Sequence, residues 1–326
     1  MKIAMCLFPE IDGKWHYALQ MGVTEAVAIG GGVPIWEYLP AARLVKKYQD
    51  FGFNLTTFEG WLPMDHIKRG TEGIEAETEQ FIAAIRNLGA LGVKCFCYSW
   101  MAKYSWIRTS FSKQTRGGAL TTAYDDEVST SSPEYQGPPI ITEAKLWETL
   151  ERFLEKVLPI CEKEGVMLAM HPDDPPLKRV FGTERIMNSV DNFERLLRLS
   201  PSKANGITLC QANFAAMNAD VPATIRKLGA DGRIHFAHFR DIVGDAHHIT
   251  ETFHDAGKTD MYEAMKAYYD VGFAGVMRPD HAPVMWGEDN SEPGYMPLGR
   301  LFAVGYMKGL MEGVEKELGL RARPNA

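Results

Sequence analysis

The sequence predicts an α/β protein that folds as a (β/α)8 barrel, also called a TIM barrel. Eight short apolar runs are found along the 326 residues, most of them followed by a longer amphipathic segment. This alternation is typical of a parallel sheet with helices outside it, and eight repeats close a barrel of about 250 residues plus insertions. No Pro-, Ser- or Gly-rich linker divides the chain. We therefore expect a single barrel domain over residues 1–326.

The predicted strands are short apolar runs bounded by turn residues. They cover residues 3–8, 25–29, 54–58, 93–98, 166–170, 206–209, 234–238 and 275–277. A doubly wound open sheet is the alternative fold, and it often carries G-x-G-x-x-G after its first strand. No such motif follows residues 3–8, and the Gly30-Gly31-Gly32 run after the second strand has a different spacing. The closed barrel is therefore favoured.

The predicted helices lie between these runs, where apolar residues recur three or four positions apart. They cover residues 39–51, 75–91, 142–164, 191–199, 220–228, 260–271 and 297–318. Glycine follows four of them just before the next strand, at Gly52, Gly92, Gly165 and Gly272. Glycine suits the left-handed conformation that ends many helices, so these positions mark helix–strand junctions.

Residues 109–139 interrupt the alternation after the fourth strand. The segment is rich in Ser, Thr, Gly and Pro, which favour turns over regular elements. Long connections of this kind in compact domains often belong to binding or catalytic sites. We expect a long active-site loop here.

Composition and charge exclude several classes of partner. The net charge of −7 and the pI near 5.8 argue against nucleic-acid binding, which usually needs a basic face. No apolar run approaches the ~20 residues that span a bilayer, and the N-terminal run lacks the features of a secretory leader. The five cysteines show no disulfide spacing. We expect a cytoplasmic protein with a small-molecule partner, and whether it forms a homo-oligomer stays open.

Candidate metal ligands stand at the ends of the last four predicted strands. They are His171, Cys210, His238 and Asp280. Each alone fits a structural role, but chance does not readily place four ligands at four consecutive strand ends. The C-terminal strand ends of such barrels carry the active site, so the four side chains should converge. One thiolate, two imidazoles and one carboxylate suit Mn²⁺, Fe²⁺, Co²⁺ or Zn²⁺ better than Ca²⁺ or Mg²⁺.

Several longer motifs surround these four residues. They are M-H-P-D-D-P-P at 170–176, A-N-G-I-T at 204–208, H-F-A-H-F-R at 235–240, R-P-D-H at 278–281 and P-G-Y at 293–295, with weaker ones at 98–100 and 106–109. With these motifs the chain resembles the mannonate dehydratase family, whose members are metal-dependent, xylose-isomerase-like barrels. The resemblance covers almost the whole chain.

The resemblance implies a chemistry. His171, Cys210, His238 and Asp280 would bind the metal, usually Mn²⁺, and His281 and Tyr295 would form the acid–base pair. The reaction would convert D-mannonate into 2-keto-3-deoxy-D-gluconate, as in glucuronate catabolism. Loss of the C2 proton gives an enediolate, which a divalent cation stabilises. One member of the pair takes this proton and the other protonates the leaving 3-hydroxyl, and the sequence does not assign which.

Other residues are candidate substrate contacts. They are Arg278, Arg240, His254, Glu251 and Asn213, of which the two arginines are candidates for binding the substrate carboxylate. Tyr295 is expected to act from the side of the substrate opposite His281. Three further histidines are interpreted as supporting residues: His235, His247 and His248.

The chain departs from the family pattern at three places. Gln211-Ala212-Asn213 follows Cys210 where Thr-Gly-Ser is usual, Ser110 replaces an Asp, and Thr250 replaces a His. These positions are expected near the substrate, so a different sugar acid, or an aldose or ketose derivative, stays open. The alternative function is a metal-dependent isomerase or epimerase of the same barrel class, which uses the enediolate without losing water.

Overall fold

The computed structural model describes residues 1–30, 32–60, 62–131 and 140–320. Eight parallel strands close into a barrel in the order β1-β14-β11-β10-β7-β4-β3-β2. They are β1 (Lys2–Leu7), β2 (Glu25–Gly30), β3 (Asn54–Gly60), β4 (Cys95–Ser99), β7 (Met167–His171), β10 (Asn205–Cys210), β11 (Ile234–Phe239) and β14 (Val276–Pro279). Every predicted strand overlaps one of these eight. The predicted TIM-barrel fold is confirmed.

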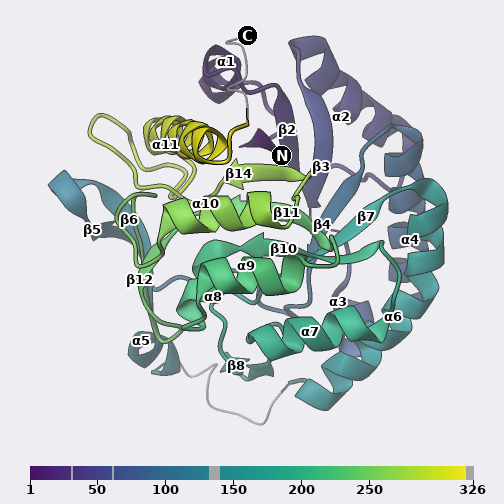
Figure 1. The fold of residues 1–326 in the computed structure, drawn as a ribbon. Helices are drawn as coiled ribbons and strands as arrows, with labels where there is room; N and C mark the ends of the chain where they lie inside the picture. The colour runs from purple at the N-terminus through teal and green to yellow at the C-terminus, as the bar shows by residue number, and fades with distance from the viewer. Residues whose placement is uncertain (31, 61, 132–139, 321–326) are drawn as a thin grey trace.

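Helices form an outer ring around these strands (Figure 1). They include α1 (Gly13–Gln20), α2 (Tyr38–Phe51), α3 (Asp65–Arg69), α4 (Ile74–Ala90), α6 (Glu143–Glu164), α7 (Val190–Leu199), α8 (Gln211–Ala216), α9 (Val221–Gly229), α10 (Met261–Asp270) and α11 (Pro297–Glu317). All seven predicted helices are present. The helices α1, α3 and α8 were not predicted, because elements this short carry little periodic signal.

Helix α6 shows how the sequence specifies the packing. Thr142 caps its start by accepting a hydrogen bond from the Lys145 backbone N–H, and Gly165 ends it at φ 66°. Between them, Leu146, Phe153 and other apolar residues of one stripe are buried against the barrel. Burial of each such side chain contributes about 1.5–3 kcal/mol. This stripe fixes which face of the helix meets the barrel.

Residues 109–139 are more regular than the sequence predicts. They contain β5 (Ser110–Gln114), β6 (Leu120–Asp125) and α5 (Asp126–Thr130), while residues 132–139 lie outside the described residues. The two strands join β12 (Ile242–Gly244) and β13 (His248–Glu251) in an antiparallel sheet of order β12-β13-β6-β5. The expectation of an irregular loop was wrong here because β6 pairs with β13, which lies far along the chain.

This small sheet lies on the C-terminal side of the barrel, since its strands follow the C-terminal ends of β4 and β11 (Figure 1). A two-stranded sheet of β8 (Arg179–Val180) and β9 (Thr183–Glu184) follows β7. These two insertions therefore gather at the end of the barrel where the candidate ligands stand.

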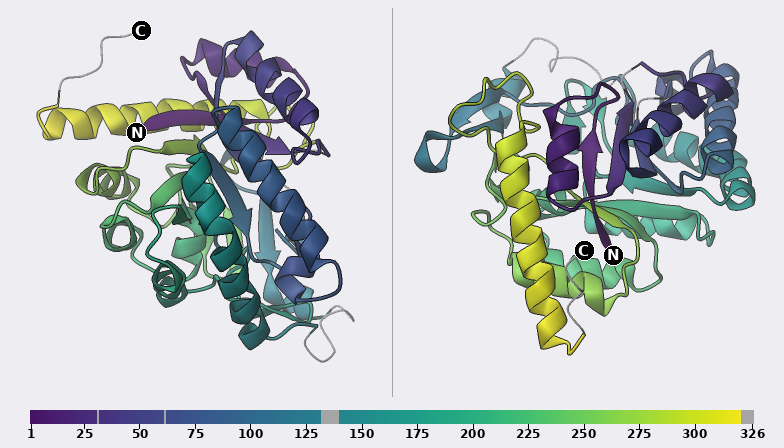
Figure 2. Two further views of the ribbon diagram at one scale, coloured as in Figure 1. Left: turned by 90° about the vertical axis from the view of Figure 1, so that its right-hand side faces the viewer. Right: turned by 90° about the horizontal axis from the view of Figure 1, so that it is seen from above.

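Figure 2 shows α11 running along the outside of the barrel near β1. Among the described helices, none is both long and apolar enough to cross a membrane.

Candidate active site

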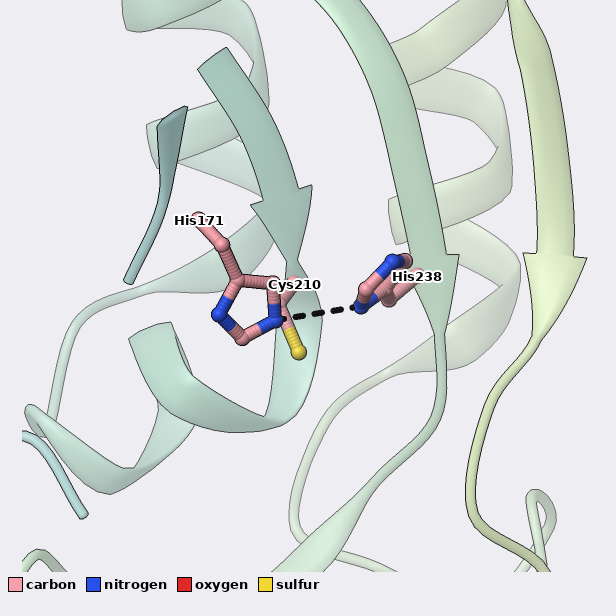
Figure 3. A group of neighbouring side chains, drawn as sticks. All are labelled: His171, Cys210 and His238. Carbon is pink, nitrogen blue, oxygen red and sulfur yellow. Dashed lines mark hydrogen bonds between the residues drawn. The ribbon is translucent and has the colours of Figure 1, made fainter. Parts of the chain in front are cut away.

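The four predicted metal ligands converge at this end of the barrel. His171 Nε2 lies 3.2 Å from His238 Nδ1, which lies 3.5 Å from Asp280 Oδ2. Cys210 Sγ lies 3.9 Å from the same carboxylate oxygen. Figure 3 shows the Cys210 sulfur between the two imidazole rings. Donor atoms of the two histidines and the cysteine all lie within 4.8 Å of one another, so one ion could contact all three.

Strand register explains this convergence. His171 and Cys210 are the last residues of β7 and β10, and Asp280 directly follows β14. Cys210 pairs with His238 across β10 and β11. Parallel neighbouring strands therefore bring these side chains to one level of the barrel mouth.

Glu59 and Arg278 hold two of these residues in place. The Arg278 guanidinium donates to both Glu59 oxygens at 3.0 Å and to Asp280 Oδ1 at 2.5 Å. Glu59 Oε2 also lies 3.4 Å from His238 Nε2, on the ring edge opposite the atom that faces His171. Burial alone would raise the pKa of Glu59, but Arg278 and His238 lower it to about 2. Glu59 is therefore a carboxylate that supports His238 directly and Asp280 through Arg278.

A second buried network lies next to this group. Arg108 contacts Asp174 at 2.6 Å and Glu251 at 2.5 Å, and Arg240 contacts each of the same carboxylates at 2.8 Å. Arg240 Nε lies 2.7 Å from Asp280 Oδ2 as well. The two guanidiniums hold the pKa of Asp174 far below its usual value, although burial opposes them. Arg240 thereby joins this network to the candidate metal ligands.

His281 links the network to Tyr295. Its Nδ1 lies 2.8 Å from Glu251 Oε1, and its Nε2 lies 3.1 Å from the Tyr295 hydroxyl. Burial would raise the pKa of Glu251, but His281 and Arg108 lower it to about 2. The ionised Glu251 accepts the Nδ1 proton, which leaves Nε2 as the acceptor for the tyrosine hydroxyl. His281 and Tyr295 thus lie side by side on the cavity wall, and the expected action of Tyr295 from the opposite side of the substrate stays a prediction.

These groups face one cavity of about 630 Å³. Its wall includes His171, His238, Asp280, His281 and Tyr295. Cys210 is not on the wall and is fully buried beneath it. The cavity therefore presents the candidate ligands and the candidate acid–base pair to the same bound molecule.

The structure places three predicted substrate contacts behind the wall. Glu251 is occupied by His281 and the two arginines. Asn213 donates to the Asp173 carbonyl and accepts from Arg240, both at 2.8 Å. His254 is fully buried, with its ring parallel to that of Phe239. None of Glu251, Asn213 and His254 is among the described residues that line the cavity.

The predicted arginines are on the wall but already engaged. Arg278 uses all three of its nitrogens on Glu59 and Asp280. Arg240 uses its nitrogens on Asp174, Glu251 and Asp280. Both side chains therefore hold protein carboxylates in place, and their role as carboxylate receptors stays a prediction.

The three histidines interpreted as supporting residues lie elsewhere. His235 lies at the opposite end of the barrel beside a separate cavity of about 400 Å³, where its Nε2 contacts the Lys203 carbonyl at 2.8 Å. It precedes His238 by three residues, and an odd spacing in a strand puts side chains on opposite faces. His247 pairs with Asp126 at 2.9 Å, and His248 is exposed. None of the three contacts the candidate ligands.

Sequence reasoning missed several residues of the site. Glu59 stands just past the end of a predicted strand, so the strand-end argument that found Asp280 would also have found it. Asp174, which lies in the 170–176 motif, is the buried partner of two arginines. Arg108 lies in the weakly matching 106–109 segment, and no local pattern reveals its distant partners.

Comparisons with known proteins agree with this geometry. The family model of D-mannonate dehydratase (UxuA) matches residues 15–136 and 133–320. Mannonate dehydratase from Thermotoga neapolitana is 34% identical, over 90% of this chain and 92% of that protein. The enzyme from Streptococcus uberis is 33% identical over 87% of this chain and 89% of its own length.

Solved structures show the same relationship. Mannonate dehydratase from Streptococcus suis serotype 2 superposes with a TM-score of 0.91 at 28% identity, covering 100% of this chain and 99% of that one. D-psicose 3-epimerase from Clostridium cellulolyticum H10 has a TM-score of 0.64 at 13% identity, over 95% of this chain and 99% of that one, and shares the fold alone.

A closed (β/α)8 barrel whose C-terminal mouth gathers two histidines, a cysteine and an aspartate defines a metal-dependent barrel enzyme. Within that class, the chain belongs to the D-mannonate dehydratase family. The family consists of hydro-lyases, and the expected dehydratase activity is confirmed over the isomerase or epimerase alternative.

Proposed function

We propose that this protein removes water from a sugar acid of the D-mannonate type, giving a 2-keto-3-deoxy acid. The observation that carries the proposal is the Glu251–His281–Tyr295 hydrogen-bonded chain beside the His171, Cys210, His238 and Asp280 group. Five of these seven residues line one cavity, with Glu251 and Cys210 behind its wall. The mannonate dehydratases among its relatives support the same substrate class.

The departures from the family pattern do not argue against a D-mannonate-like substrate. Asn213 is tied to Asp173 and Arg240, and Thr250 accepts from Lys113 Nζ at 2.8 Å. Ser110 belongs to β5. None of Gln211, Ala212, Asn213, Ser110 and Thr250 is among the described residues on the cavity wall. The expectation that these positions meet the substrate therefore has no support in the lining of the cavity.

The donor set fits a divalent transition metal. His171, His238, Cys210 and Asp280 would hold the ion, with Mn²⁺ the expected one and Fe²⁺, Co²⁺ or Zn²⁺ the alternatives. The ion supplies Lewis-acid charge that stabilises the negative charge developing on the substrate carboxylate. Arg278 and Arg240 hold Asp280 in its ionised form, the form that binds a cation.

The geometry supports one assignment of the two proton-transfer roles. Glu251 keeps a proton on His281 Nδ1, so Nε2 is unprotonated and takes the C2 proton once the Tyr295 hydroxyl turns to the leaving 3-hydroxyl, and Glu251 then stabilises the imidazolium. Burial, reinforced by Asp280, raises the pKa of Tyr295 well above its usual value, so its hydroxyl stays a donor for the leaving 3-hydroxyl. The 3.1 Å contact then lets His281 return a proton to Tyr295. The C2 proton thus replaces the Tyr295 proton that leaves with the 3-hydroxyl as water. The remaining enol takes up a proton at C3 while its 2-hydroxyl loses one, which gives the 2-keto-3-deoxy acid.

An assay of a panel of aldonates tests the proposed reaction. The metal-loaded protein is expected to convert D-mannonate into a 2-keto-3-deoxy acid, measured with thiobarbiturate, faster than it converts other six-carbon aldonates. Product NMR distinguishes the competing outcome. If no deoxy acid forms and an epimerised sugar accumulates, the proposal is wrong.

Replacement of Glu59 by glutamine is expected to weaken metal binding about 10–100-fold, the usual effect of losing a carboxylate that orients a ligand histidine. Glutamine keeps the size of Glu59 but loses the charge that supports His238 and Arg278. The measurement is metal titration by calorimetry. The matched control is Glu25→Gln, a buried glutamate paired with Lys2 at the other end of the barrel. Equal affinities in the two variants would contradict this role.

We further propose a cytoplasmic enzyme of glucuronate catabolism that binds neither nucleic acid nor membranes. The acidic pI and the five cysteines, all of them buried free thiols, support this location. A homo-oligomer remains a proposal that sedimentation would test.

A further inference from the structure

Two cationic side chains on the cavity wall, Lys68 and Lys103, form no ion pair with any described residue, and of the two Lys68 is the partly buried one. Arg240 and Arg278 have ion-pair partners on all their nitrogens. Lys68, the fourth residue of α3, is partly buried and also lines the cavity. Its Nζ donates to the Met101 carbonyl at 3.2 Å and forms no ion pair with any described residue. An ammonium group has three donors, so two remain available to a ligand.

The position of Lys68 is fixed by its helix. Its backbone N–H donates to Met64 O at 2.9 Å, and its carbonyl accepts from Thr149 Oγ1 of α6 at 2.8 Å. Gly70 ends α3 at φ 68°. Lys68 therefore lines the cavity from a backbone anchored on both sides. An anchored backbone lowers the conformational entropy that is lost when the side chain binds a ligand. A side chain held in this way can therefore discriminate between ligands.

Two carboxylates share this part of the wall with Lys68. They belong to Asp65 and Glu77, and the latter accepts the Ile67 backbone N–H at 2.9 Å. Burial lowers the pKa of Lys68 to about 8, with Asp65 opposing the shift, so the charged form still predominates at neutral pH. Free donors beside acceptors suit sugar hydroxyls, because each hydroxyl both donates and accepts.

We propose that Lys68, with Asp65 and Glu77, binds the hydroxyl groups at the end of the substrate remote from its carboxylate. The inference rests on the proposed function and adds the orientation of the sugar acid. The carboxylate takes the end of the cavity with the histidines and Asp280, where the cation is expected. Asp65 is already paired with Arg69 at 3.0 Å, but Glu77 forms no ion pair with any described residue and would repel a second carboxylate beside Lys68, so the subsite selects a neutral polyol tail over a diacid.

Lys68→Met tests the subsite, because methionine keeps the length of the side chain and removes its donors. The KM for D-mannonate is expected to rise about 10–100-fold, as for loss of a hydrogen bond to a charged group, with kcat changed much less. A four-carbon aldonate of matching configuration at C2 and C3 lacks the distal hydroxyls. For this shorter substrate, the kcat/KM of Lys68→Met is expected to stay within about twofold of the wild-type value. Because kcat/KM for D-mannonate falls in the same variant, the preference for six carbons over four is lost.

Lys103→Met is the matched control. Lys103 also lines the cavity, but it is exposed and its Nζ lies over the Tyr104 ring at 5.0 Å from the centroid. This variant is expected to keep the wild-type chain-length preference. If Lys68→Met fails to fold, Lys68→Gln takes its place, because the glutamine amide can still donate to the Met101 carbonyl. Lys68→Gln should lose the preference for six carbons to a smaller extent.

The outcomes separate the two proposals. A wild-type protein that dehydrates no aldonate overturns the proposed function and the subsite together. If the wild type is active but does not prefer six carbons over four, or if Lys68→Met retains that preference, only the subsite is wrong. Faster turnover of an aldaric diacid than of D-mannonate would also overturn the subsite.

Discussion

Cys210→Ser is expected to abolish both metal binding and dehydratase activity. The Cys210 sulfur lies under the cavity wall between His171 and His238, and 3.9 Å from Asp280. A serine hydroxyl does not ionise near neutral pH and reaches less far than a thiolate, so the site loses both a charge and a ligand. Loss of a residue that only hydrogen-bonds to a metal ligand typically lowers metal affinity roughly 10–100-fold. The affinity of Cys210→Ser for the metal should fall by more than that. His171→Ala should have the same effect, because it removes an imidazole from the same group.

Metal content per chain after dialysis, measured by plasma mass spectrometry, checks this prediction. The matched control is Cys161→Ser, which changes a fully buried cysteine of α6 outside the site. Its metal content should remain that of the wild type even if its melting temperature falls. Full metal occupancy in both Cys210→Ser and His171→Ala would show that the ion binds elsewhere.

His281→Ala and Tyr295→Phe are expected to lower kcat about 10²–10⁴-fold, the usual contribution of a positioned acid or base. His281 takes its orientation from Glu251, and its Nε2 contacts the Tyr295 hydroxyl. Since neither residue belongs to the candidate metal ligands, metal content should stay unchanged. The two losses should not add in the double variant, because the residues act as a hydrogen-bonded unit.

Steady-state kinetics with D-mannonate, together with metal analysis, checks the assignment. His235→Gln is the control, since this histidine lies on the same strand as His238 but at the other end of the barrel. It should keep the wild-type kcat. Full turnover in His281→Ala and Tyr295→Phe would exclude them as the acid–base pair. Loss of metal in either variant would instead place that residue among the ligands.

The sequence predicted the barrel well because barrel strands and outer helices are specified locally. Each buried strand is a short apolar run, and each helix carries an apolar stripe, as α6 does with Leu146 and Phe153. The antiparallel sheet could not be found this way. The strand β6 is stabilised by β13, more than 100 residues away, and no local pattern records that pairing.

The candidate ligands were also accessible from sequence, since His171, Cys210, His238 and Asp280 follow one rule about strand ends. The direction of a side chain within a strand also depends on spacing, and His235, three residues before His238, lies at the opposite end of the barrel from the ligands it was expected to support. Whether Arg240 is free or paired depends on Asp174, which approaches it from the connection after β7, and on Glu251, which belongs to β13 later in the connection of Arg240 itself.

By itself, therefore, the sequence determined the barrel, the ligand types at its mouth and the family, because all three are recorded in local patterns and short motifs. Only the tertiary structure decided which charged groups neutralise one another and which remain available. It placed His281 against Tyr295, engaged both arginines and left Lys68 with free donors. The physical reason is that ion pairing depends on distances between residues far apart in the chain, and only closure of the barrel sets those distances.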